Sequence, residues 1–355
     1  MNITIDKSIF DRFGTPEVNK NTFSKVLHTA QDKYHTISLS ETCGIEDIFS
    51  IIDSNDIYFL QDLFVGSITK PEKRSSDCLV KVGGENEAIK KEFSLEEVYE
   101  YIVSPADIIL ENGKNDGALI RAIEAHFDSD LSFETLLKET VAHIDNSGGS
   151  GDRSRVEYYL NLHGGKQKFL HCCVIVDGDK RFPNDTRKES LQKDYFAMYN
   201  NLGVKYHVWE KRAMENYMPD EVFIANRDNW GRLWVDAYLS LKPEQKDYYN
   251  IASGFSADMT AKLPENYTSL PKGMDTHFND VHPTNFHRLV SPPSIAPTPN
   301  APINPLLKKK NTMKDNFPTY FSTPEVRYDT LNNRTSHQND PDELLHVAQM
   351  IRQII

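Results

Sequence analysis

The feature that most constrains the fold of this chain is an unbroken apolar run that ends in acidic residues. The run covers Phe169–Val176, and Asp177, Gly178 and Asp179 follow it directly. A strand that is buried on both faces of a parallel sheet has this continuous apolar pattern. We therefore expect a central parallel strand here, with two carboxylates at its end.

Strands and helices alternate on either side of this run. Further strands are expected at Asp107–Leu110 and Val204–Trp209. Asp116 can cap a helix whose apolar residues recur at helical spacing. The helices expected after it cover Phe133–Ile144, Arg155–Leu162 and Leu191–Asn201. This alternation predicts an α/β fold with a mainly parallel sheet and flanking helices.

The first hundred residues give shorter and more mixed signals. Segments 35–39 and 56–60 fit strands or short helices, and Cys78–Val82 followed by two glycines fits a strand that enters a hairpin turn. Ser94 stands three residues before Glu97, which is the pattern of a capping box at the start of a helix. That helix should end near Ser104, because the following proline disfavours helical geometry in its predecessor.

The chain divides into four parts on these patterns. We expect a mixed α/β N-terminal region over residues 1–104 and a catalytic domain with a helical extension over 105–262. A proline-rich linker or extended segment should cover 263–340, since six prolines fall between positions 292 and 305. A last helix, Glu343–Ile354, capped by Asp340 or Asp342, is too short to be stable alone, so it should dock on the body or on another chain.

Charge and composition narrow the classes of function. The chain has 40 Lys and Arg against 52 Asp and Glu, a net charge of −12, which argues against a protein that wraps nucleic acid with a basic surface. No run approaches the roughly 18 apolar residues of a membrane span, and no secretory signal opens the chain. Cys172 and Cys173 lie in the apolar run, where reduced, buried thiols are expected. We expect a soluble cytoplasmic protein without a membrane partner.

Acidic residues follow three of the expected strands. Glu111 comes after the first, Asp177 and Asp179 after the second, and Glu215 shortly after the third. The carboxyl ends of parallel strands meet at one edge of a sheet, where ligands bind. Carboxylates gathered there repel one another unless a cation joins them, and Mg²⁺ prefers oxygen ligands. The sequence therefore predicts a site for Mg²⁺ or Mn²⁺ and the hydrolysis or transfer of phosphodiesters.

Each acidic motif also has a plainer interpretation. Asp-Gly-Asp alone is more often a polar turn, and Glu111 alone is more often an ordinary carboxylate before a helix. Both stand directly after buried strands, and a third acid lies downstream. That combination favours a site, with Glu111 as general acid or base or as a further metal ligand.

The segment around these acids is basic for this chain. From Asp177 to Glu215 it has 8 basic and 7 acidic residues, a charge of +1 within a chain of −12. This favours an anionic substrate, with Lys211, Arg212 and Lys180 as the phosphate contacts. Arg187 and Lys188 fit an ordinary solvated helix face better.

Three segments, residues 108–116, 174–179 and 209–219, together resemble a TOPRIM domain. They are most similar to the overcoming-lysogenization-defect (OLD) nucleases and to the TOPRIM effectors encoded beside ATPases in bacterial anti-phage systems. The family pattern has Glu-Gly at a strand end, Asp-x-Asp after a later strand, and Glu-Asn-Tyr-Leu/Met-Pro after the next. Residues 215–219 match the last element without a gap, whereas Asn112 stands where the pattern has glycine. The resemblance covers about residues 105–225.

The resemblance implies a Rossmann-like sheet and a metal-dependent nuclease. It assigns catalysis to Glu111, Asp177 and Asp179, with Glu215 as a supporting carboxylate of the Mg²⁺ or Mn²⁺ site. It further implies a toxic effector of anti-phage defence that a separate ATPase controls, acting on DNA, tRNA or other RNA. The N-terminal region and the last helix are then the expected contacts to that ATPase or to a second copy in a homodimer.

Two other readings stay open. One is a non-catalytic TOPRIM-like module that binds a partner or nucleic acid, which carboxylates paired with Lys or Arg would favour. The other is primase-type phosphoryl transfer, against which the absence of a zinc-binding cysteine cluster counts.

Overall fold

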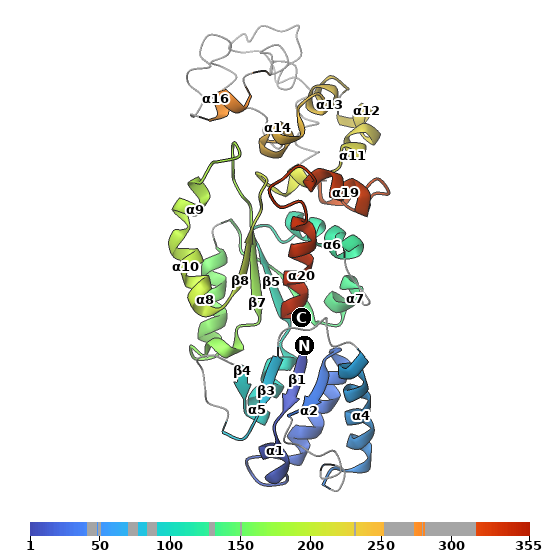
Figure 1. Cartoon of the computed structure of the whole chain (residues 1–355), viewed down its shortest axis with the longest axis vertical. Coiled ribbons are helices and arrows are strands. Elements are labelled where there is room, and N and C mark those ends of the chain that lie inside the picture. The colour runs from blue at the N-terminus through green and yellow to red at the C-terminus, as the bar shows by residue number, and fades with distance from the viewer. Residues whose placement is uncertain are drawn as a thin grey trace.

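The computed structural model describes residues 1–40, 48, 51–69, 77–83, 91–127, 132–149, 151–230, 232–251, 273–278, 280 and 317–355. Within them the chain is an α/β protein with two four-stranded sheets, both entirely parallel. The sheets follow one another along the long axis of the molecule, with the N-terminal sheet at one end (Figure 1). The expected α/β class with parallel strands is confirmed.

The first sheet has the strand order β2-β1-β3-β4. Its strands are β1 (Asn2–Ile5), β2 (Thr36–Leu39), β3 (Asp77–Val80) and β4 (Lys91–Phe93). Its helices are α1 (Lys7–Asp11), α2 (Lys20–Asp32), α4 (Ser54–Thr69) and α5 (Leu95–Val103). Alternate strand residues, among them Ile3, Ile5 and Val80, join one apolar core with α2, α4 and α5.

Two local predictions for this region are confirmed and one is wrong. Ser94 and Glu97 form the expected capping box, and α5 ends at Val103 with Ser104 as its C-cap. Segment 56–60 is helical within α4, and segment 35–39 is mostly β2. The hairpin expected after Cys78 is absent, because β3 and β4 pair in parallel with Cys78 opposite Lys91.

The second sheet has the order β6-β5-β7-β8. Its strands are β5 (Ala106–Leu110), β6 (Ala142–Asn146), β7 (Cys172–Val176) and β8 (Lys205–Val208). Every residue of the central strands β5 and β7 is buried, as the apolar run predicts. Cys172 and Cys173 are free, buried cysteines, as expected.

Helices cover both faces of this sheet. The connecting elements are α6 (Asn115–Phe127), α7 (Phe133–Lys138), α8 (Asp152–Leu162), the 3-10 turn η1 (Gln167–Phe169), α9 (Arg187–Leu191) and α10 (Lys193–Leu202). Residues of α6 and α7 join one apolar cluster, whereas those of α8 and α10 join another. The two groups lie on opposite sides of the sheet in Figure 1.

The helix expected over Phe133–Ile144 is wrong in its second half. It ends at Lys138, and β6 begins at Ala142. Thr140 has a φ of 55°, a left-handed conformation that a helix does not contain. β6 is an edge strand, and its mixed polar and apolar residues concealed it in the sequence.

Every regular element that the structure describes after β8 is a helix. These elements are η2 (Met214–Tyr217), α11 (Asp220–Ala225), α12 (Arg227–Trp230), α13 (Arg232–Leu239), α14 (Pro243–Tyr248), α16 (Met274–His277), α19 (Tyr328–Thr335) and α20 (Glu343–Ile354). None of the described helices is long and apolar enough to cross a membrane.

The last helix docks on its own chain. α20 has the predicted bounds and packs on α6 and β7, with Leu344, Val347 and Ile351 buried. The expected linker does not reach residue 340, because Phe317, Phe321, Val326 and Leu331 are buried in the same core as α20. The proline-rich stretch of residues 292–305 lies outside the described residues. α20 runs beside the second sheet, and the two ends of the chain lie close together (Figure 1).

Candidate active site at the carboxyl edge of the second sheet

The structure brings the predicted acidic residues together. Glu111 follows β5, Asp177 and Asp179 follow β7, and Glu215 lies in η2 after β8. All three strands are parallel, so their carboxyl ends share one edge of the sheet. Each of the other carboxylates lies close enough to raise the pKa of Asp177. The spatial grouping expected from the sequence is therefore present.

Asp116 is a fifth carboxylate in this group, and sequence reasoning did not assign it to the site. Asp116 was expected to cap α6, but Asn112 does so. The Oδ1 of Asn112 accepts from the backbone N–H of Lys114 at 3.2 Å and of Asn115 at 3.1 Å. Asp116 lies in the first turn, buried, and its Oδ2 accepts from the Asn112 N–H at 2.7 Å. Asn112, which replaces the glycine of the TOPRIM pattern, therefore caps the start of α6. Asp116 lies in the first turn of this helix.

Burial, together with repulsion from neighbouring carboxylates, raises the pKa of Glu111, Asp116 and Asp177. Burial is the main cause that raises the pKa of Asp177 well above its usual value, and Asp116, Glu111, Glu215 and Asp179 raise it further. Burial, together with the charges of Glu111 and Glu215, raises the pKa of Asp116 to about 7. A site of this kind holds more negative charge than its surroundings neutralise.

The pH dependence of stability tests this repulsion. The Asp116 carboxyl has a raised pKa in the folded chain, so its contribution to stability is fully present below pH about 4 and is lost as the pH rises to about 7. The loss is on the order of 4 kcal/mol. In EDTA, Asp116→Asn should flatten this fall in the free energy of unfolding, measured by urea denaturation from pH 4 to 8. Asp194→Asn, an exposed control, should leave the slope unchanged, and an equal slope in Asp116→Asn would contradict the argument.

Gly178 lets the loop after β7 approach the loop after β8. A Cβ atom at this position would lie 2.2 Å from the Lys211 carbonyl oxygen and 2.4 Å from that of Trp209. The neighbouring Asp179 has a φ of 51°, and its N–H donates to the Arg212 carbonyl at 2.8 Å. The Asp-Gly-Asp turn is thus held against the loop that leads to Glu215.

Lys188 belongs to the site, contrary to the solvated helix face expected for it. Its side chain is only 8% exposed. Its Nζ lies 2.5 Å from Glu111 Oε1 and 3.0 Å from Asp179 Oδ2, so one ammonium group bridges two of the predicted catalytic carboxylates. Burial raises the pKa of Glu111 and outweighs the opposing effect of Lys188.

Lys211 does not fit its predicted role as a phosphate contact. Its side chain is fully buried and pairs with Asp247, and burial lowers its pKa to about 8. A fully buried ammonium group cannot reach a substrate, so the predicted role of Lys211 is wrong. The sequence placed it beside Glu215 but could not show that Asp247, 36 residues later, would take its charge.

The other predicted phosphate contacts remain near the acidic group. Arg212 is half-buried, and its pKa is lowered by burial and by Arg187 and Arg181 but raised by Asp179. Arg187 is exposed and donates to the Asp179 carbonyl at 3.1 Å. Lys180 Nζ lies 3.8 Å from Glu189 Oε1, which is a loose ion pair. Arg187 is therefore a further candidate for phosphate binding that the sequence analysis did not assign.

The chemistry of the donor set suits a hard divalent cation, but the side chains are not arranged around one. Carboxylate oxygens are the ligands that Mg²⁺ and Mn²⁺ prefer. Among the described residues, no group of three or more His, Cys, Asp and Glu side chains is placed to hold a metal ion. Two of the five carboxylates are engaged by Lys188 instead. A cation at this edge therefore competes with that lysine.

Buried polar residues from the C-terminal part of the chain hold the loop around Glu215. Glu343 of α20 is fully buried and accepts from the Tyr217 hydroxyl at 2.5 Å and the Glu210 N–H at 2.7 Å. Asn216 donates through Nδ2 to the carbonyls of Lys246 at 2.7 Å and Tyr249 at 2.8 Å. The position of Glu215 thus depends on contacts with residues far away in the sequence.

A second set of buried polar side chains, centred on Asp247, lies next to the loop around Glu215. Asp247 pairs with Lys211, with the Arg334 guanidinium at 3.3 Å and with His337 Nε2 at 2.7 Å. Arg334 also donates to the Asn216 carbonyl at 2.8 Å. The side chains of Lys211, Arg334 and Asp247 are all less than 10% exposed, so their charges depend on one another rather than on water.

Comparison of the chain with protein-family models, with curated proteins and with solved structures gives no match in any of the three.

Proposed function

We propose that this chain is a metal-dependent nuclease of the TOPRIM type, which hydrolyses phosphodiester bonds in DNA or RNA. The observation that supports this most is the gathering of five carboxylates at the carboxyl edge of one parallel sheet, with raised pKa values at Glu111, Asp116 and Asp177. Their repulsion is relieved when a divalent cation binds. When bound, Mg²⁺ supplies polarisation of the phosphate and lowers the pKa of a water molecule.

The residues of this chain have separate roles in the proposal. Asp177 and Asp179, supported by Glu215, provide the oxygen ligands. Glu111, whose pKa is raised, serves as the general acid or base. Arg187, which donates to the Asp179 carbonyl, and Arg212, which lies close enough to Asp179 for its charge to act, hold the phosphate groups of the substrate.

A non-catalytic TOPRIM-like module is the second candidate. The specific observation in its favour is Lys188, which pairs with Glu111 and Asp179 as a permanent counter-charge would. The two proposals differ in what the lysine does when Mg²⁺ or Mn²⁺ is offered. In a nuclease the cation displaces the Lys188 ammonium group from the carboxylates, and in a binding module the ion pairs of Lys188 persist.

Substitution of Lys188 distinguishes the nuclease from the non-catalytic module. We expect isothermal titration calorimetry to detect Mn²⁺ binding to the wild-type chain, and Lys188→Met to bind it about tenfold more tightly, because a positive charge beside two ligands is lost. Lys193→Met, which removes an exposed lysine of α10, is the matched control and should bind like the wild type. If neither the wild type nor Lys188→Met binds Mn²⁺, the non-catalytic module is the better account.

The biological setting of the proposal comes from the resemblance alone. We propose a toxic effector of anti-phage defence in the cytoplasm, which a separate ATPase holds inactive. Expression of the wild type without that ATPase should then slow bacterial growth, and Asp177→Asn should not.

A further inference from the structure

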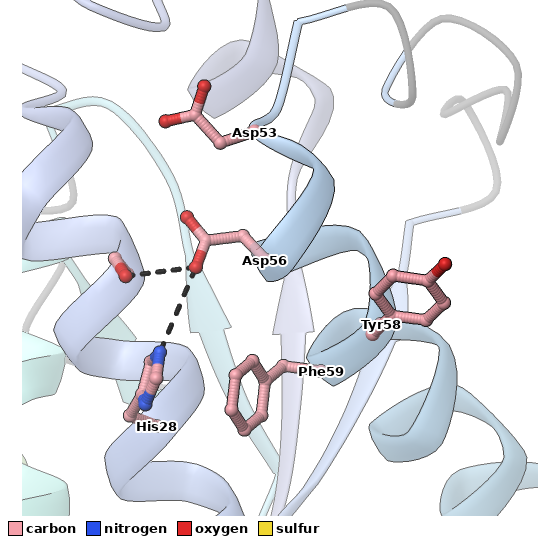
Figure 2. Close-up of a pocket in the computed structure, with 6 residues that line it drawn as sticks. His28, Asp53, Asp56, Tyr58 and Phe59 are labelled. Carbon is pink, nitrogen blue, oxygen red and sulfur yellow. Dashed lines mark hydrogen bonds and ion pairs between the residues drawn. The ribbon is translucent and has the colours of Figure 1, made fainter.

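The N-terminal domain has a surface pocket far from the acidic site. It lies between α2 and the start of α4 and has a volume of about 390 Å³. Its walls combine carboxylates, a hydroxyl, an imidazole and two aromatic rings. The lining residues are Ser24, His28, Asp53, Asp56, Tyr58 and Phe59. Figure 2 shows Asp56 between Asp53 and the neighbouring rings of His28 and Phe59.

Asp56 is held in a fixed orientation in this pocket. Its Oδ1 accepts from the Ser24 hydroxyl at 2.9 Å and lies 3.9 Å from His28 Nε2. Its side chain is 12% exposed. Both contacts use the same oxygen, and the other oxygen is turned toward the side where Asp53 lies (Figure 2). The pocket therefore presents two carboxylates, one fixed and one exposed, to an incoming group.

The surface beside the pocket is apolar for an exposed helix. Tyr58 and Val65 of α4 are 69% and 58% exposed. They are seven residues apart, which places them on the same side of the helix. Exposed tyrosines next to a polar pocket are typical of protein interfaces.

The wall of the pocket that α4 forms is acidic. Asp53 directly precedes this helix, and the helix itself has Asp56 and Asp62 and no basic residue. A positively charged group complements these carboxylates.

We infer that this pocket is the docking site for a basic segment of a partner protein, with an arginine or lysine side chain bound between Asp53 and Asp56. Guanidinium and ammonium groups form strong hydrogen bonds with carboxylates, and arginine also stacks on aromatic rings. Tyr58 and Val65 then contact apolar residues that flank the basic one. This inference does not depend on the nuclease proposal.

Fluorescence anisotropy with a defined peptide tests the inference. The probe is a labelled nonapeptide of glycine and leucine with two arginines, and the same peptide with glutamate in place of arginine is its control. We expect the arginine peptide to bind the full chain in 0.15 M salt and the glutamate peptide not to bind. Asp53→Asn/Tyr58→Ser, which changes two exposed side chains, should weaken binding at least tenfold.

A variant that loses charge elsewhere in the same domain shows whether the pocket is responsible. Glu96→Gln/Glu100→Gln removes two exposed charges from α5 of the same domain and should change the affinity less than twofold. An equal loss in both double variants would show general charge attraction and overturn the inference. So would spermidine that competes as well as the peptide, since the site would then take a free small cation. Peptide binding that strengthens tenfold when Lys308–Lys310 are changed to alanine would identify the chain's own basic run as the occupant and also overturn it.

Discussion

Asp177→Asn is expected to abolish Mg²⁺-dependent cleavage of nucleic acid, and Glu111→Gln to reduce its rate at least about 100-fold. Asp177 interacts with every other carboxylate of the site, so its loss removes the central ligand of the proposed metal centre. Glu111 loses its ability to exchange a proton when it becomes an amide. The measurement is the rate of cleavage of labelled DNA and RNA with Mg²⁺ or Mn²⁺.

Two controls show whether a loss of cleavage is specific to the site. Glu157→Gln and Asp236→Asn remove carboxylates from ion pairs elsewhere on the surface and should cleave at the wild-type rate. The variants at the site should keep the wild-type circular dichroism spectrum. Cleavage by Asp177→Asn at the wild-type rate would remove the proposed function.

Asp247→Asn should destabilise the fold by about 3–5 kcal/mol, because it leaves Lys211 and Arg334 buried without their counter-charge. Burial opposes ionisation of Asp247, but His337, Lys211 and Arg334 outweigh it and lower its pKa. The stability that Asp247 contributes is therefore present above the usual pKa of an aspartate and is lost as the pH falls through its lowered value. Urea denaturation at pH 7 measures the effect.

Two further variants identify the cause of that loss. Asp228→Asn breaks an exposed pair with Arg232 and should lower stability far less than Asp247→Asn does. The double variant Asp247→Asn/Lys211→Met should regain part of the stability, because one uncompensated buried charge is removed. A loss at Asp247 no larger than at Asp228 would contradict the buried network.

The sequence predicted those parts of the fold whose pattern is local. The apolar run identified β7, the serine–glutamate pair identified the start of α5, and the spacing of apolar residues identified α20. β6 was missed because edge strands are half polar, and α7 before it has a clear helical pattern. The pairing of β3 with β4 depends on a strand that is only three residues long, which no pattern distinguishes.

The candidate site was predictable to the extent that strand ends position it. Glu111, Asp177 and Asp179 meet because parallel strands end at the same edge. Lys188 and Lys211 could not be assigned correctly, since each depends on a partner distant in sequence. Lys188 reaches Glu111 across 77 positions, and Lys211 pairs with Asp247 across 36 positions.

The contact of α20 with the loop around Glu215 has a consequence for protein synthesis. Tyr217 and Glu210 find their buried acceptor only after residue 343 has left the ribosome. A growing polypeptide therefore contains the residues of β5 and β7 long before the loop around Glu215 can take its final position. The edge of the second sheet that gathers the five carboxylates is therefore completed only after α20 has been synthesised.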